Sequence, residues 1–382
     1  MWRVGLDKMG LMYRPAPLAV LVGLVAVLAA ACGSNLVSPS PPVPIDSPPP
    51  PPSGSPVVTP ISSEPSSEAA MWTRLSPSGP GPSAREGHTW TADPSSGLTY
   101  LFGGRGDQGA LDDLWAYDLG ADAWSRLRPA GPVPPARFGH TAVWVDGVGL
   151  VIFAGQAGSG SPMADLWAYD PDADRWHELP SSGDGPAART GSCAAVGPDG
   201  RIWISHGATG DGTGVEDTWA YDLNVEGWSD ETPTGRGPVA RSGHRCWWTA
   251  DGRLVAYAGE TPGGVALDEL WTLAAPGGPG SAWARAEGDP TIPRSLAAFD
   301  ASRDPIVVVG GLGTGGALLA DIVMFDATTL APSFVKQAGE APGGRAGAAL
   351  VDDPAAERRL LFGGQDGSGL LDELWQLDVS AG

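Results

Sequence analysis

The feature that most constrains this chain is one heptapeptide that occurs three times at a fixed interval. "DDLWAYD" begins at residue 112, "ADLWAYD" at 164 and "EDTWAYD" at 216, so each copy begins 52 residues after the previous one. Weaker copies continue at the same interval, with "DELWTL" at 268, "ADIVMFD" at 320 and "DELWQLD" at 372. A period of this length is typical of folds that repeat one supersecondary unit. We therefore expect a fold built from six similar units.

Four positions recur in every unit at or near this period, and the units are numbered here in chain order. The central position holds Trp115, Trp167, Trp219, Trp271, Val323 and Trp375. The arginine column is Arg85, Arg137, Arg189, Arg241, Arg294 and Arg345. The glycine column is Gly104, Gly155, Gly207, Gly259, Gly311 and Gly364. The aromatic column is Trp72, Trp124, Trp176, Trp228, Trp283 and Phe334.

The second unit shows what one repeat predicts. "RFGHTAVWV" (137–145) alternates, an Asp-Gly pair marks a tight hairpin, and "GLVIFAG" (149–155) follows. "DLWAYD" (165–170) and "RWHEL" (175–179) predict two more strands, and no useful helical period is present. Four-stranded antiparallel sheets repeated radially make a β-propeller, a fold that leaves short, protected strand edges.

The first unit resembles the kelch-repeat family in all four parts of the repeat. These parts are the Arg-x-Gly-His start "REGH", the Gly-Gly ending of "LFGGR", the tryptophan strand "DDLWAYD" and the fourth strand "AWSRL". The resemblance covers residues 71–379 and implies an all-β, six-bladed kelch-type β-propeller. The fifth unit departs most, because "RSLA" lacks the Gly-His pair and Val323 replaces tryptophan.

The order of strands at the two ends predicts how such a propeller closes. "MWTRL" (71–75) reads as a fourth strand that comes before the first arginine. The last unit stops after its third strand, with "VSAG" left over. We therefore expect the N-terminal strand around Trp72 to complete the last blade.

The arginine column has two interpretations. An acid stands two residues before each central position, and all of these residues fall at one end of the blade. The acids are Asp113, Asp165, Asp217, Glu269, Asp321 and Glu373. In the structural interpretation each arginine bridges to its acid across the second strand, and the glycine column leaves room for the crossing. In the alternative, the six arginines ring the channel mouth and bind an anionic ligand.

Candidate catalytic groups are few. His88, His140 and His244 occupy the Gly-His position on separate units, where we expect packing between blades rather than a metal site. The chain shows no catalytic triad order, phosphate loop or dinucleotide fingerprint. We assign no catalytic residue, cofactor or metal, and the fold alone implies no chemistry.

The N-terminal region predicts export and anchoring. Residues 1–31 combine a basic start with the apolar run "LAVLVGLVAVLAA", which is short for a membrane span. The run leads into "LAAACGS", which resembles a bacterial lipoprotein signal with Cys32 as the lipidated residue. Residues 32–70 are a Pro/Ser-rich linker, and residues 71–382 form the propeller. The expected location is extracytoplasmic, with a lipid anchor to the bacterial cell membrane or cell surface.

Charge narrows the range of partners. The formal net charge is −21, and a chain this acidic is repelled by the phosphates of nucleic acids and of anionic membranes. We therefore expect no nucleic-acid partner and no membrane contact other than the lipid anchor. We expect a monomeric, membrane-anchored scaffold whose propeller loops bind a protein or glycan partner. The alternative is a kelch-type enzyme acting on sugars, like a sialic-acid epimerase or a galactose oxidase. Convergent His, Arg and Glu side chains at the channel centre would favour the enzyme.

Two cysteines remain besides Cys32. Cys193 lies four residues after Arg189, and Cys246 lies five after Arg241, on the first strands of neighbouring units. This opposite parity lets the two side chains face each other across the interface between blades. Export permits oxidation, so the pair forms either a disulfide or two buried thiols, and both alternatives remain open.

Overall fold

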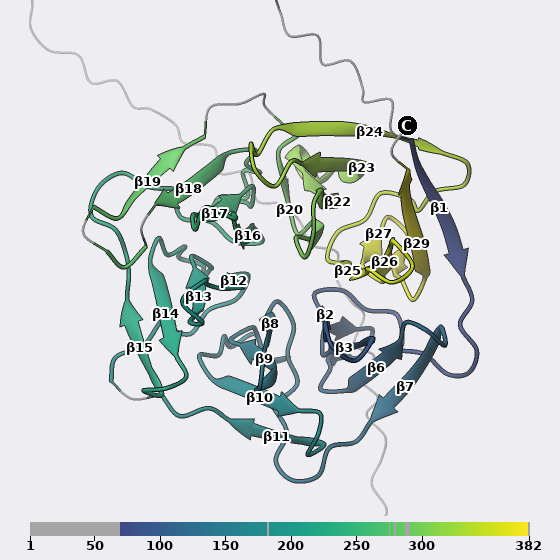
Figure 1. The fold of residues 1–382 in the computed structure, drawn as a ribbon, viewed down its shortest axis with the longest axis horizontal. Coiled ribbons are helices and arrows are strands. Elements are labelled where there is room, and N and C mark those ends of the chain that lie inside the picture. The colour runs from purple at the N-terminus through teal and green to yellow at the C-terminus, as the bar shows by residue number, and fades with distance from the viewer. Residues whose placement is uncertain (1–68, 182, 275, 279, 287–290, 381–382) are drawn as a thin grey trace, which may run out of the picture. The chain divides into compact units, whose positions relative to one another are not determined.

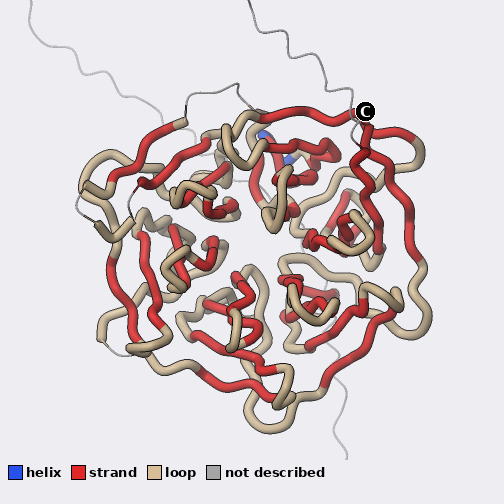
Figure 2. Tube along the Cα trace, in the orientation of Figure 1, coloured by secondary structure: helices blue, strands red, loops and turns tan. Residues whose placement is uncertain are grey.

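The computed structural model describes residues 69–382 apart from 182, 275, 279, 287–290 and 381–382. Strands and loops make up nearly all of this part, and a short 3-10 turn, η1 (Thr314–Gly316), interrupts them (Figure 2). Nothing among the described residues forms a helix long and apolar enough to cross a membrane. The expectations for the signal segment, Cys32 and the linker up to residue 68 lie outside the described residues.

Units 1 to 4 each form a four-stranded antiparallel sheet. Unit 1 has β2 (Thr89–Ala92), β3 (Leu98–Phe102), β6 (Leu114–Asp118) and β7 (Ala123–Leu127). Unit 2 has β8 (Thr141–Val145), β9 (Gly149–Phe153), β10 (Leu166–Asp170) and β11 (Arg175–Glu178). Unit 3 has β12 (Cys193–Val196), β13 (Ile202–Ser205), β14 (Thr218–Asp222) and β15 (Gly227–Asp230). Unit 4 has β16 (Arg245–Trp248), β17 (Leu254–Tyr257), β18 (Leu270–Ala274) and β19 (Ala282–Arg285).

Units 5 and 6 share one nine-stranded sheet. Unit 5 has β20 (Arg294–Ser295), β21 (Ala298–Asp300), β22 (Ile306–Gly313), β23 (Leu318–Phe325) and β24 (Pro332–Ala338). Unit 6 has β25 (Ala349–Asp353), β26 (Arg358–Phe362) and β29 (Leu374–Ser380), with β1 (Ala69–Leu75) beside β29. Small hairpins join β4 (Arg105–Gly106) to β5 (Gly109–Ala110) and β27 (Gln365–Asp366) to β28 (Gly369–Leu370).

Strand β1 links the start of the described chain to its end. It pairs antiparallel with β29 along its whole length, with Trp72 opposite Leu377. It also pairs in parallel with β24, with Ala69 opposite Lys336, and this second pairing was not expected from the sequence. Trp72 is buried, and its indole Nε1 donates to Gln337 Oε1 at 2.7 Å.

The sheets stand side by side around a common centre, with the first strand of each unit innermost and the fourth outermost (Figure 1). The core fills the spaces between neighbouring sheets. Tyr100 and Phe102 of unit 1 pack against Ile152, Tyr169 and Trp176 of unit 2. First and last units are packed in the same way, through a cluster that includes Trp90 and Leu360. The result is a β-propeller-like all-β fold.

A circle of backbone hydrogen bonds joins the units near the centre. Two residues after each column arginine, the amide N–H donates to the carbonyl oxygen of the equivalent residue in the preceding unit, at 2.8 or 2.9 Å. The series returns to its start, since Gly87 donates to Gly347. Its members are Gly87, Gly139, Gly191, Gly243, Leu296 and Gly347. Because Gly139 is engaged in this circle, β8 begins at Thr141 rather than at Arg137, where the sequence pattern began.

Candidate functional site

The column arginines and acids form six internal bridges. In unit 2, Arg137 Nη1 donates to Asp165 Oδ1 at 2.8 Å, and Nη2 donates to Oδ2 at 2.6 Å. Nη1 also donates to Ala154 O and Nε to Pro135 O, so the guanidinium binds backbone on both sides. The full set is Arg85–Asp113, Arg137–Asp165, Arg189–Asp217, Arg241–Glu269, Arg294–Asp321 and Arg345–Glu373. The structural interpretation of the arginine column therefore predicted the contacts that are present.

Burial makes these bridges costly to break. The Arg137 side chain has no exposed area, and that of Asp165 is 20% exposed. Burial alone would raise the pKa of Asp165, but the hydrogen bonds and charge of Arg137 outweigh it and hold that pKa below its usual range. An anionic ligand would have to displace this internal carboxylate to reach the guanidinium.

The glycine column serves a different purpose from the one expected. A Cβ added at Gly155 would lie 2.7 Å from His140 Cβ, and one added at Gly104 would lie 2.9 Å from His88 Cβ. At these two positions the close neighbour is therefore the residue just before the first strand of the same unit, rather than a crossing guanidinium. Gly155 also has a φ of 94°, which L side chains rarely adopt. An arginine is a close neighbour at Gly207, where an added Cβ would lie 3.3 Å from Arg189 Cδ, so clearance for the arginine bridge does not explain the column as a whole.

The Gly-His histidines pack between units. The His140 ring meets Phe102 of the preceding unit edge to face at 5.5 Å, and the His88 ring meets Phe362 at 5.6 Å. Burial, followed by the charge of Arg85, lowers the pKa of His88 to about 3. Burial and the charge of Arg137 also lower the pKa of His140. In the described part of the chain, no three His, Cys, Asp or Glu residues are placed to hold a metal ion.

These histidines predict a loss of stability in mild acid. An unfolded histidine gains its proton near pH 6.5, whereas folded His88 and His140 stay neutral far below that. The unfolded state therefore binds more protons, and the free energy of unfolding falls by about 1.4 kcal/mol per pH unit per histidine below pH 6.5. Between pH 7 and pH 5 the unaltered chain should lose more free energy of unfolding than the His140→Ala variant, by about 2 kcal/mol. Urea unfolding at the two pH values measures both losses.

The fold itself supplies the control for this experiment. Alanine already occupies the histidine position in units 5 and 6, as Ala297 and Ala348, so His140→Ala suits the local backbone. His177→Ala, at an exposed site, should leave the pH dependence as it is in the unaltered chain. An unchanged pH dependence for His140→Ala would contradict the prediction.

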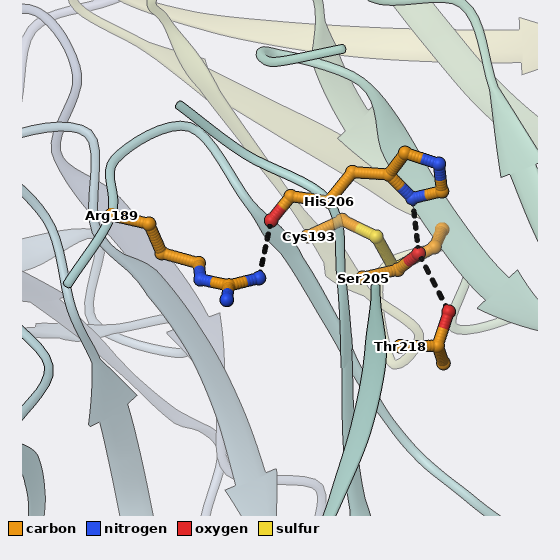
Figure 3. Close-up of a disulfide and its surroundings, with 6 residues drawn as sticks. Arg189, Cys193, Ser205, His206 and Thr218 are labelled. Atoms are coloured by element: carbon orange, nitrogen blue, oxygen red, sulfur yellow. Dashed lines mark hydrogen bonds between the residues drawn. A yellow bond between two sulfur atoms is a disulfide. The ribbon is translucent and has the colours of Figure 1, made fainter. Parts of the chain in front are cut away.

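Cys193 and Cys246 form a disulfide between β12 and β16, with a Cα–Cα distance of 5.7 Å (Figure 3). Both residues are buried, as expected for the interface between units 3 and 4. Of the two alternatives left open by the sequence, the structure has the disulfide. A galactose-oxidase-like site needs a cysteine paired with tyrosine, and the disulfide occupies both of these cysteines.

The disulfide predicts a measurable share of the stability. It closes a loop with a sequence separation of 53 residues, and a crosslink of that length is worth roughly 4 kcal/mol in the loop-entropy description. We expect the double variant Cys193→Ala/Cys246→Ala to lose about that much free energy of unfolding in urea. Peptide mapping without reductant should recover the two cysteines in one linked species; two separate alkylated peptides would contradict the structure.

The sequence reasoning missed a second set of ion pairs, which are buried except at the half-exposed Asp122. Arg359 Nε donates to Asp300 Oδ2 at 2.8 Å, which links unit 6 to unit 5. Arg358 donates to Asp353 at 2.8 Å and to Asp122 at 2.7 Å, which links unit 6 to unit 1. These residues stand outside the repeat columns. The available signal was the pair of arginines that begins the otherwise apolar strand "RRLLF".

The described loops at the arginine end form a collar, in which loops of units 2, 3 and 4 contact one another. They follow the second and fourth strands of each unit, which end on the same side because neighbouring strands are antiparallel. A Cβ added at Gly210 would lie 3.0 Å from Pro162 Cδ, and one at Gly214 would lie 2.7 Å from Pro262 Cγ, so loops of neighbouring units touch. The collar also carries exposed apolar side chains, namely Val133, Val239, Val265 and Ile292.

These features define a repeat-built, β-propeller-like protein. They are the antiparallel sheets repeated around a centre, the arginine–acid bridges and the collar of loops. The family model described as "KLHDC2/KLHL20/DRC7 Kelch-repeats domain" matches residues 66–259. The chain therefore belongs to the kelch-repeat family.

Several curated proteins share this repeat region. Human multiple epidermal growth factor-like domains protein 8 is 31% identical over 203 residues, covering 51% of this chain and 7% of that protein. Serine/threonine-protein phosphatase BSL2 of Arabidopsis thaliana is 28% identical over 279 residues, covering 66% of this chain and 27% of that protein. Adagio-like protein 3 of Oryza sativa subsp. japonica is 30% identical over 200 residues, covering 50% of this chain and 31% of that protein. The matches thus span less than a third of each relative.

Proposed function

We propose that this chain is a binding scaffold built on a six-bladed kelch propeller, which strand β1 closes by completing the sixth blade. Three contacts between the start and the end of the described chain support the closure. They are the pairing of β1 with β29, the hydrogen bond from Gly87 to Gly347, and the hydrogen bond from Gly364 to Arg85. No covalent link is needed for such a ring, because main-chain pairing satisfies the strand edges.

The binding surface in this proposal is the collar at the arginine end, and the partner is a protein or glycan. The observation that carries this assignment is the distribution of exposed apolar side chains. Among the described residues, four of the six large exposed hydrophobic side chains lie in the collar, whereas Val225 lies at the opposite end and Met71 on β1. Variable loops on a rigid frame are common recognition surfaces.

The collar assignment is tested by capture of a partner. The intact chain, crosslinked on cells of its source, should retain a specific partner that Val239→Asp and Val265→Asp both lose. Val225→Asp is the matched control at the opposite end, and it should retain the partner. Loss with Val225→Asp and retention with both collar variants would place the binding surface elsewhere.

The proposal also places the scaffold outside the cytoplasm, anchored by lipid on Cys32. Support comes from the basic, apolar and small-residue order of residues 1–31 and from the oxidised Cys193–Cys246 pair, which suits an exported protein. Cys32→Ser should abolish metabolic labelling with a fatty acid and release the protein from membranes. Labelling that survives this change would remove the anchor from the proposal.

A further inference from the structure

The centre of the sheets contains a cavity of about 220 Å³ lined by the first strands of the units. Most of its lining is small or apolar, including Gly87, Ala142, Ala194 and Ala349. Arg245 is the one residue with a formal charge in the described lining, and no carboxylate faces it there. A lone cation in such a cavity needs an explanation.

The internal contacts of Arg245 leave most of its donors unused. Nε donates to Ala297 O at 2.8 Å, and Nη2 donates to the same oxygen. A guanidinium has five N–H donors, so three remain. Among the described residues, no acid bridges to this arginine as one does to each column arginine. Burial lowers the pKa of Arg245 to about 10, which leaves it charged at neutral pH.

Arg245 is a departure from the repeat. It stands four residues after Arg241, and the equivalent residues in the other units are small. They are Thr89, Thr141, Cys193, Ala298 and Ala349. The other five units therefore do not need a long or charged side chain at this position. In unit 4, Arg245 uses Nε and Nη2 to contact Ala297 O of unit 5, and its remaining donors have no such structural use.

Other polar atoms in the lining also lack partners. Ser192 Oγ, both ring nitrogens of His88 and Nδ1 of His140 are buried without a hydrogen bond. All three residues line the cavity together with Arg245. Buried polar groups in native proteins are almost always bonded to protein, water or a ligand. The His88 and His140 rings pack against Phe362 and Phe102 between units, so their unbonded nitrogens are not shown to face the cavity as Arg245 does.

We propose that the central cavity binds a small oxyanion, of the carboxylate or phosphate class, through Arg245. The guanidinium offers paired N–H donors that match two oxygens of such a group. The volume admits a small organic acid or inorganic phosphate. This site lies inside the ring of first strands, so it is separate from the collar, and failure of one assignment leaves the other intact.

The test is titration of the intact chain with sodium acetate and, separately, sodium phosphate, at constant ionic strength maintained with sodium chloride. We expect a saturable rise in melting temperature and a saturable change in total tryptophan fluorescence, to which Trp90 in the cavity lining contributes as one of 16 tryptophans. Saturation with acetate alone assigns a carboxylate ligand to the site. Saturation with phosphate alone assigns a phosphate ligand. Saturation with both anions assigns the oxyanion chemistry that the two share. The absence of saturation with either ion overturns the proposal.

Arg245→Thr introduces the residue that units 1 and 2 already carry and should weaken anion binding at least tenfold. The control is Arg253→Thr, which removes a surface arginine paired with Asp251 and should bind as the unaltered chain does. Equal affinity for Arg245→Thr would refute the site. Crystals of the unaltered chain soaked in sodium selenate give a second readout that does not depend on any variant. Anomalous density beside Arg245 is expected, and its absence counts against the proposal.

Discussion

Deletion of residues 69–75 is expected to lower the melting temperature by about 10 °C or more, or to prevent folding. The segment is β1, which lies between β24 and β29 and pairs with both. Its Trp72 packs in a cluster with Ile322, Met324 and Leu377, and truncating a buried tryptophan alone costs about 3–5 kcal/mol. The deletion would also leave unpaired edges on two strands.

The matched control removes seven residues from the proline-rich segment 47–56, whose composition cannot contribute a packed core. This deletion should leave the melting curve unchanged, because the segment contributes nothing to the core. It is a matched control because both deletions shorten the chain by the same number of residues. Trp72→Ala provides an intermediate case and should lower the melting temperature by about half as much as the deletion of residues 69–75, or less. Equal melting temperatures for the two deletions would show that the sheets close without β1.

The repeat made much of this fold predictable from the sequence. The spacing of the tryptophan, arginine and acid columns placed Arg137 and Asp165 at the same end of one sheet, where they do bridge. The same register assigned Trp72 to a strand beside the last unit, and it pairs with Leu377. Periodic residues are predictable because each is constrained by the same local geometry in every unit.

Features that depend on one unit alone were harder to predict. The parity of Cys193 and Cys246 indicated facing side chains, but parity does not determine distance, and the disulfide needed a Cα–Cα approach of 5.7 Å. Arg245 and the Arg359–Asp300 pair stand outside the repeated columns, so the columns did not predict their contacts. The glycine column was visible in the sequence, but the close approach of His140, just before β8, to Gly155 could be seen only in the structure.

Arg137→Ala is expected to reduce the free energy of unfolding by about 3–5 kcal/mol, the cost of removing one partner of a buried ion pair. The change leaves Asp165 with Trp167 Nε1 as its remaining side-chain donor and deprives Ala154 O of the guanidinium. Urea unfolding at pH 7 measures the loss. Arg175→Ala removes an exposed arginine of the same unit and should change stability by less than about 0.5 kcal/mol.

The double variant Arg137→Ala/Asp165→Ala distinguishes a structural bridge from a ligand site. Removing both charges leaves neither buried and unpaired, so the double variant should be more stable than Arg137→Ala alone. This recovery is the signature of a bridge whose partners serve each other. Arg137→Ala with normal stability and lost binding of an anionic ligand would instead support arginines that ring the channel mouth. The bidentate contact at 2.6 and 2.8 Å, repeated as an arginine–acid pair in all six units, favours recovery.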